Sequence, residues 1–123
     1  MDLARLTADL RAFAAERDWD QFHSPKNLAI ALSVEAAELL EHFQWLTEAE
    51  SAALGPDVRE QVAHELADVL IYLVRLADRV GVDLDAAVTR KLAINAAKYP
   101  ADRVRGRADK YDRYESDEAH HRD

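Results

Sequence analysis

Two long helical stretches, each with a pair of acidic residues on its apolar side, constrain the fold of this chain more than any other feature. The stretches are Leu28–Leu46 and Val58–Val80, and both repeat apolar residues with the period of an α-helix. The two pairs are Glu35 with Glu38, and Glu65 with Asp68. Because each residue turns a helix by about 100°, the first acid of each pair falls about 20°, and the second about 80°, from the first apolar residue of its stretch. Both helices therefore direct two carboxylates, in the same phase, toward a face that should be buried.

Four carboxylates directed toward a core are costly unless a cation lies between them. Two acidic pairs with i, i+3 spacing, on neighbouring antiparallel helices, would form a four-carboxylate cage. Oxygen ligands of this kind suit Mg²⁺, with Mn²⁺ as a substitute. A single acidic pair is typical of a solvated helix surface, but the repeat in matched phase favours a metal site. Iron is disfavoured, because neither pair has a histidine three residues after an acid.

The composition indicates one globular, all-α domain. Among 123 residues, 49% are hydrophobic and 33% charged, only three are glycine and three proline, and alternating apolar runs are absent. The net charge of −8 argues against a nucleic-acid partner, but allows a phosphorylated small molecule bound through metal ions. The absence of cysteine excludes disulfides and thiol chemistry. Because no signal peptide and no apolar membrane span are recognised, we expect a cytoplasmic protein without a membrane partner.

Capping and breaking residues divide the chain into a bundle of four to five helices. Ser, Thr and Asp cap helix starts, proline is favoured in the first turn, and glycine ends helices. The expected helices run from Asp2 or Thr7 to about Arg17, from Ser24-Pro25 to about Trp45, from Thr47 to Gly55, from Pro56 to about Gly81, and from Leu84 to Lys98. We expect residues 1–100 to form the domain and 101–123 a polar, flexible tail, with one short contact around Lys110 and Tyr111.

A second group of candidate residues lies on the last predicted helix. Lys91, Asn95 and Lys98 recur at i, i+4 and i+7, which places them on one helix face, and Tyr99 follows. Two cations and an amide on one stripe can bind phosphate oxygens that metal ions bind from the other side. The alternative is a solvated basic helix end that complements the helix dipole.

Aromatic residues form a third group, near the ends of the second predicted helix. Trp19, His23 and Trp45 are candidates for stacking on a flat ring such as a nucleobase. Tyr72 has the phase of the second acidic pair and would lie one or two turns beyond it. Ordinary core packing is the alternative for the first three side chains, and for Tyr72 the alternative is a hydrogen bond that satisfies a core carboxylate.

These groups belong to four motifs that occur in a fixed order within residues 3–100. The motifs are Trp19-Asp20-Gln21-Phe22-His23-Ser24-Pro25-Lys26-Asn27-Leu28, Glu35-x-x-Glu38-Leu39-x-Glu41-x-Phe43-Gln44-Trp45, Glu65-Leu66-x-Asp68-Val69-Leu70-Ile71-Tyr72-Leu73 and Lys91-x-x-x-Asn95-x-x-Lys98-Tyr99-Pro100. Together they resemble the MazG-like all-α nucleoside triphosphate pyrophosphohydrolases, and most of all the dCTP pyrophosphatase branch. One departure from that branch is Leu10, which stands where dCTP-preferring relatives carry a histidine.

The resemblance implies Mg²⁺-dependent hydrolysis of a (deoxy)nucleoside triphosphate to the monophosphate and pyrophosphate. The substrate that it favours is dCTP or a modified dCTP. It implies that the four acids of the two pairs are the metal ligands and that Trp19, His23 and Trp45 line the base and sugar pocket, with Tyr72 nearby. The triphosphate would meet Lys91, Asn95, Lys98 and Tyr99. Glu38 or Glu41 is the candidate for orienting the attacking water.

The same resemblance implies a homotetramer, built as a dimer of dimers with active sites completed across subunits. Apolar residues on further sides of the two long stretches also predict a homo-oligomer assembled through helix packing, because helices that are apolar nearly all round need cover on both sides. They are Ile30, Val34, Ile71 and Val74. The alternatives are a dUTP-directed or broad-specificity enzyme of the same fold, a non-catalytic nucleotide- or metal-binding module, and a helical assembly protein with structural acids.

Overall fold

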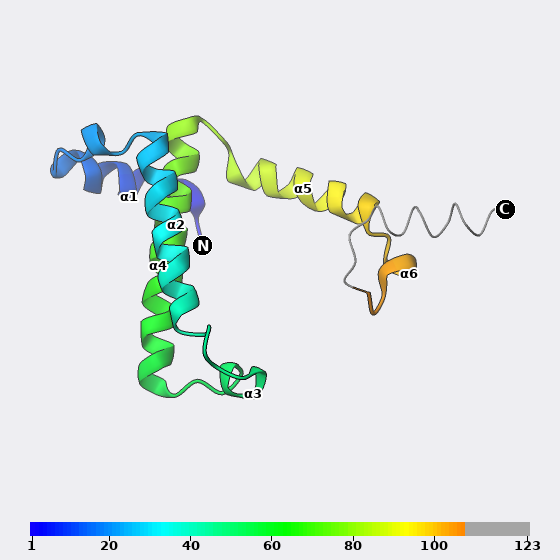
Figure 1. The fold of residues 1–123 in the computed structure, drawn as a ribbon. Helices are drawn as coiled ribbons and strands as arrows, with labels where there is room; N and C mark the ends of the chain where they lie inside the picture. The colour runs from blue at the N-terminus through cyan, green and yellow to red at the C-terminus, as the bar shows by residue number, and fades with distance from the viewer. Residues whose placement is uncertain (108–123) are drawn as a thin grey trace. The chain divides into compact units, whose positions relative to one another are not determined.

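The structure is a computed structural model that describes residues 1–107, and these form six α-helices, one 3₁₀ helix and no strand (Figure 1). The elements are α1 (Leu3–Glu16), η1 (Asp20–Phe22), α2 (Pro25–Glu41), α3 (Glu48–Ser51), α4 (Pro56–Val80), α5 (Leu84–Lys98) and α6 (Ala101–Val104). The all-α prediction is confirmed for this range. None of the helices described combines the length and the apolar character needed to cross a bilayer. The chain divides into two compact units, Met1–Leu84 and a second that begins at Asp85.

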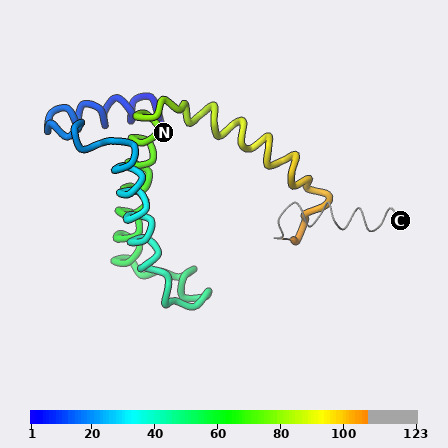
Figure 2. The backbone as a smooth tube through the Cα atoms, turned by 45° about the horizontal axis from the view of Figure 1, so that its top comes forward, coloured from blue at the N-terminus to red at the C-terminus, as the bar shows by residue number. Residues whose placement is uncertain are grey.

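In the first unit, α2 and α4 lie side by side and run antiparallel (Figures 1 and 2). Leu28 of α2 and Val62, Val74 and Ala77 of α4 are buried. The α1 helix packs on α4, and Ala14 is its buried residue. The remaining apolar residues of the two long helices are half-buried or exposed, so this unit has a thin core that follows the α2–α4 contact.

Local chemistry explains where the helices begin. Asp2, rather than Thr7, caps α1, because its side chain accepts a hydrogen bond from the Arg5 backbone N–H at 3.1 Å. Ser24 caps α2 in the same way, with Asn27 N–H at 3.2 Å and proline in the first turn. The capping box predicted at the start of α3 is present, since Thr47 and Glu50 bond each other's backbone N–H groups.

The predicted end of α4 is confirmed and that of α2 is not. Gly81 ends α4 in the left-handed conformation, with φ 74°, which favours glycine. The prediction that the second helix reaches Trp45 was wrong, because α2 ends at Glu41. There the backbone N–H groups of His42 and Phe43 bond carbonyls three residues back, at 3.2 and 2.9 Å, which tightens the last turn.

Two further differences concern short elements. The third helix ends at Ser51, four residues before the predicted end at Gly55, since Ala52 already serves as its C-cap. The α5 helix, which belongs to the second unit from Asp85 on, has the predicted bounds, Leu84–Lys98. A short helix, α6, follows directly after Pro100, within the segment predicted as a tail. The contact predicted around Lys110 and Tyr111 lies outside the described residues.

Candidate functional site

Three of the four predicted metal ligands meet between α2 and α4. Glu35 and Glu38 come from α2 and Glu65 from α4, and each offers a carboxylate oxygen such that all three oxygens lie within 4.8 Å of one another. All three residues are half-buried. Antiparallel packing brings the two pairs to the same level of the helices, so residues 30 apart in sequence share one site. This arrangement of oxygen atoms can hold a divalent cation.

The carboxylates of this cluster are poorly satisfied by the protein itself. Within the described residues, Oε2 of Glu35 and Oε2 of Glu65 are shielded from solvent and have no hydrogen-bond partner. Burial and the neighbouring carboxyl groups of Glu65, Glu38 and Asp68 raise the pKa of Glu35 to about 7. Shielded anionic oxygens without a partner are costly, and a hard cation is the ligand that would satisfy them. The chemistry of the donor set therefore fits Mg²⁺ or Mn²⁺.

The other two predicted acids stand apart from this group. Asp68 lies one turn beyond Glu65 on α4 and is half-buried, but its carboxylate is not among the three oxygens within 4.8 Å. Its charge still reaches the cluster, since it contributes to the raised pKa of Glu35. Glu41 is the last residue of α2 and is exposed. The roles of Asp68 as a ligand and of Glu41 near the water stay predictions.

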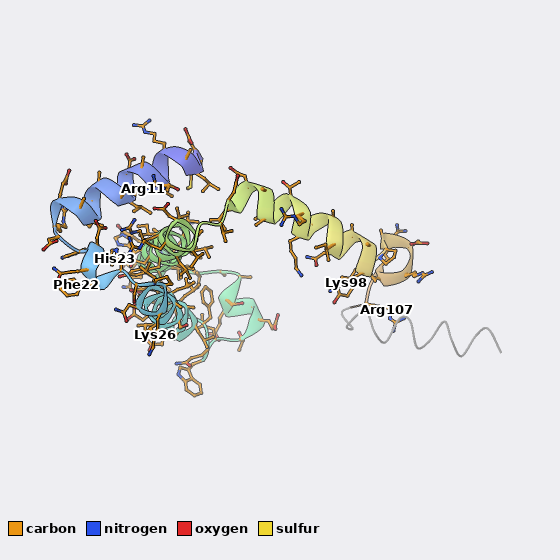
Figure 3. All side chains as sticks on the ribbon, turned by 90° about the horizontal axis from the view of Figure 1, so that it is seen from above. Arg11, Phe22, His23, Lys26, Lys98 and Arg107 are labelled. Atoms are coloured by element: carbon orange, nitrogen blue, oxygen red, sulfur yellow. The ribbon has the colours of Figure 1, made fainter. Side chains whose placement is uncertain are left out.

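Trp19 and His23 lie together in the segment between α1 and α2. Their ring centroids are 6.3 Å apart, and the Trp19 ring also contacts Phe13 of α1 edge to face, with centroids 5.7 Å apart. Trp19 keeps 43% of its surface exposed, so a flat ligand can reach it. In Figure 3, His23 lies between the η1 segment and the α2–α4 pair. Two of the predicted pocket residues are therefore brought together by this segment.

Trp45 lies at the other end of α2, just beyond Glu41, and is 87% exposed. Since α2 has 17 residues, about 25 Å of helix separates this tryptophan from the Trp19–His23 segment. One chain therefore does not bring both tryptophans to the two faces of a single ring. Tyr72 is half-buried on α4, one turn beyond Asp68, between the carboxylate cluster and the level of His23.

Arg75 is a site residue that reasoning from the sequence missed. It is the one charged side chain that is buried among residues 1–107, with 5% exposure, and its Nε donates a hydrogen bond to Nδ1 of His23 at 3.2 Å. A signal was available, because Arg75 interrupts an apolar run and has nearly the same helical phase as Asp68, about 20° away.

The predicted phosphate-binding residues belong to the second unit. Lys91 and Lys98 are exposed on α5, and Asn95 is half-buried there. Tyr99 follows the helix and its backbone N–H bonds the Asn95 carbonyl at 2.8 Å. One stripe of α5 thus carries the two lysines and the amide, as predicted. Their contact with a phosphate stays a prediction.

Fold and site together define an all-α protein with a carboxylate cluster that can hold a divalent cation. Residues 30–113 match the model of the MazG-like family, and the chain belongs to this family. The predicted family is thereby confirmed. The matched range contains both acidic pairs and the α5 stripe.

Two curated relatives and one solved structure agree with this assignment. The chain is 52% identical to human dCTP pyrophosphatase 1 and 50% identical to the mouse protein of that name, over 112 residues each. This alignment covers 89% of the chain but 64% of each relative, so the chain spans less than two thirds of their length. A pyrophosphatase from Archaeoglobus fulgidus has 42% identity and a TM-score of 0.70, covering 79% of this chain and 91% of that one.

Proposed function

We propose that this chain is a Mg²⁺-dependent pyrophosphohydrolase that converts a (deoxy)nucleoside triphosphate to its monophosphate and pyrophosphate. The observation that carries the proposal is the carboxylate cluster, in which two shielded oxygens lack a partner within the described residues. Membership of the MazG-like family supports the reaction class. The names of the curated relatives favour dCTP as the substrate. We extend the proposal to a modified dCTP and to a house-cleaning role in the nucleotide pool. A dUTP-directed or broad-specificity enzyme is the alternative.

The acids would act as cation ligands and as the base that orients water. Glu35, Glu38 and Glu65, with Asp68 from the next turn, would hold the Mg²⁺, which when bound neutralises negative charge on the triphosphate. Glu38, or alternatively Glu41, would accept a hydrogen bond from the attacking water and direct its oxygen at phosphorus. The bond between the α and β phosphates then breaks, pyrophosphate leaves, and the water proton passes to a carboxylate or to solvent.

The remaining site residues would bind the substrate away from the reacting bond. Trp19 and His23 would contact base and sugar, with Tyr72 between them and the acids. The α5 stripe would bind the phosphates through Lys91 and Asn95, helped by Lys98 and Tyr99. Charged groups that bind the leaving pyrophosphate stabilise the charge that develops on it during the reaction.

Pyrophosphate release from a panel of dNTPs, with Mg²⁺ or Mn²⁺, tests this function and ranks the bases. Glu65→Gln should lower turnover by about 100-fold or more and weaken Mn²⁺ binding measured by calorimetry, because it removes an anionic ligand. Glu16→Gln is the matched control, since Glu16 is an exposed acid of α1 outside the cluster. No pyrophosphate from any nucleotide would instead favour a non-catalytic binding module.

The proposed enzyme is a homo-oligomer, a tetramer built as a dimer of dimers. Exposed apolar residues on both long helices support an oligomer; they include Ile30 and Val34 on α2 and Leu66 and Ile71 on α4. Val74, which was also predicted to need cover, is instead buried within this chain. A second copy would also bring its Trp45 to a site that holds Trp19. Ile30→Glu should lower the mass found by light scattering, whereas Lys26→Glu, an exposed change nearby, should lower it less. A wild-type monomer at micromolar concentration would contradict this proposal.

The domain limits and the location are also proposals. We assign the catalytic domain to residues 1–100 and a tail to 101–123, although the family match continues to residue 113. A nucleotide-pool enzyme acts where nucleotides are made and used, so we propose a cytoplasmic location. A chain that ends at Pro100 tests the domain limit: retained activity would support it, and loss of activity would contradict it.

A further inference from the structure

Arg75 is a buried charge with an unusual set of partners. A buried guanidinium is tolerated only when its N–H groups are paired. Here Nη2 donates to Oδ1 of Asp20 at 2.6 Å, Nη1 donates to Oδ2 of Asp78 at 3.3 Å, and Nε donates to Nδ1 of His23 at 3.2 Å. One side chain of α4 therefore binds two residues of the segment between α1 and α2.

The bond to His23 determines where the imidazole carries its proton. The guanidinium of Arg75 stays charged and only donates, so Nδ1 of His23 must accept and the proton of the neutral ring lies on Nε2. Burial and the charge of Arg75, with a smaller effect of Arg79, lower the pKa of His23, and Asp20 opposes this effect. At neutral pH, His23 is thus an uncharged ring whose other nitrogen, Nε2, is a hydrogen-bond donor.

The network also holds the segment itself. Asp20 is the first residue of η1, and Trp19 directly precedes it, so the bond to Arg75 anchors the turn that carries both aromatic rings. Asp78, the third partner, also accepts hydrogen bonds from Arg11 of α1, at both of its carboxylate oxygens. Figure 3 shows Arg11 and His23 on the same side of the α2–α4 pair. The segment is therefore tied to α4 and, through Asp78, α4 to α1.

We propose that Arg75 is a positioning residue of the nucleotide site, which sets the tautomer of His23 and fixes the Trp19–His23 segment on α4. His23 then presents Nε2–H to an acceptor atom of the base or sugar, and Arg75 itself does not contact the nucleotide. The inference rests on the proposed function, in which this segment binds the substrate. The sequence motifs name only the residue types of the pocket. The inference adds the position of one proton, on Nε2 of His23, which would help to determine nucleotide specificity.

Nitrogen-15 NMR of the full chain labelled at its five histidines tests the tautomer, with His23→Gln used for assignment. In the wild type, the long-range proton–nitrogen pattern should show His23 with its proton on Nε2 at pH 7 and titrating below pH 6.5. In Arg75→Met, the ring should become a mixture of tautomers with a higher pKa. A wild-type proton on Nδ1 would overturn the proposal, and this result does not depend on whether Arg75→Met folds.

The kinetic arm separates positioning from a general loss of structure. In Arg75→Met, KM for dCTP should rise about three- to tenfold, the range expected for one lost hydrogen bond, while kcat changes by less than about twofold. Calorimetric Mn²⁺ binding by the acidic cluster should be unchanged. Arg75→Lys, which keeps the charge but loses the planar fork, should give an intermediate KM. Arg59→Met, an exposed arginine of α4 about 24 Å away along the helix, is the matched control.

Two outcomes distinguish this proposal from the proposed function. A changed tautomer with an unchanged KM would overturn the positioning role, because His23 would then not donate to the nucleotide. Absence of pyrophosphate release from the wild type, with the His23 tautomer as described, would contradict the enzymatic function instead. A parallel fall in kcat and Mn²⁺ affinity in Arg75→Met would identify a structural residue and also overturn the proposal.

Discussion

The carboxyl group of Glu35 lies among other carboxyls, and its pKa is raised to about 7 from an ordinary value of 4.5. An acid whose pKa is higher in the folded state favours folding only while it is protonated. Its contribution to the free energy of unfolding therefore falls as the pH rises from about 4.5 to about 7. Without a cation, this one residue makes the protein less stable at pH 8 than at pH 5.

Replacing Glu35 with glutamine should remove that pH dependence. In EDTA at pH 8, Glu35→Gln should melt a few degrees higher than the wild type, and the difference should vanish near pH 5. Adding Mn²⁺ should raise the wild-type Tm at pH 8 more than at pH 6, and that of the variant little, since binding to the folded state stabilises it. Differential scanning calorimetry measures both effects. Parallel wild-type and variant curves would contradict the argument.

Trp45 illustrates the opposite case, a large side chain with almost no contact inside its own chain. Trp45→Ala should change the free energy of unfolding of the isolated chain by less than about 0.5 kcal/mol, because the ring is 87% exposed. The KM for dCTP should nevertheless rise about tenfold, the cost of a lost stacking partner. Trp45→Phe, which keeps a flat ring, should recover most of the affinity. A large KM in both variants would point to a role other than stacking.

At the scale of helices, the starts could be predicted from local chemistry, whereas the end of α2 and the presence of α6 could not. Ser24-Pro25 and the Thr47 capping box act within one turn, so they are visible in the sequence. The early end of α2 depends on a tightened turn after Glu41 that no breaker residue marks. The short α6 was missed because its segment is polar and has no apolar stripe.

The candidate site, too, could be predicted only in part from the sequence. Helical phase was enough to bring Glu35, Glu38 and Glu65 together, since antiparallel helices of matched phase must face each other. The level of α2 against α4 is a property of packing, so it could not be foreseen that Asp68 lies outside the three-oxygen group. Arg75 was missed because its partners, Asp20 and His23, are more than 50 residues away in sequence.

Asp78 joins α1 to α4, and this link gives a second prediction about pH. The hydrogen bond from Arg11 is the main reason that the pKa of Asp78 is lowered, with the charges of Arg11 and Arg75 adding to it against burial. A carboxyl with a lowered folded-state pKa stabilises the protein above its ordinary pKa of 3.8, and this stability is lost as the pH falls through the lower value.

Asp78→Asn should therefore lower the Tm at pH 7 by about 4 °C or more and flatten the loss of stability in acid. Circular dichroism melts between pH 2 and 7 measure both. Asp9→Asn, an exposed acid of α1, serves as the control. An unchanged acid limb would show that Asp78 is not the group responsible.

For the whole molecule, the distance between the two tryptophans bears on how many chains would form one proposed substrate site. Trp19 precedes α2 and Trp45 follows it, about 25 Å apart along the helix, so neither chain alone encloses a base between them. Which surfaces meet in an oligomer depends on a partner chain, and one sequence read by itself cannot specify it. The exposed apolar faces of α2 and α4 indicate only that such surfaces exist.

Mixing two variants that bind dCTP weakly should restore part of the activity at low dCTP if sites are shared between subunits. Trp19→Ala and Trp45→Ala proteins, refolded together in equal amounts, should regain about one quarter of wild-type turnover at low dCTP. Half of the dimers would be mixed, and each would contain one site with both tryptophans. Pyrophosphate release before and after mixing measures this. Activity that never exceeds the mean of the two variants would place each site within one chain.

The antiparallel match of α2 with α4 makes the length of α2 a fixed quantity. One residue inserted between Leu28 and Glu35 would rotate both acids of α2 by about 100° and turn them away from Glu65. The same insertion would leave in place the Ser24 cap of α2 and the hydrogen bond from Arg75 of α4 to His23. In related sequences, insertions should therefore accumulate in the loops around α3, while the interval from the Ser24 cap to the acids keeps a constant number of residues.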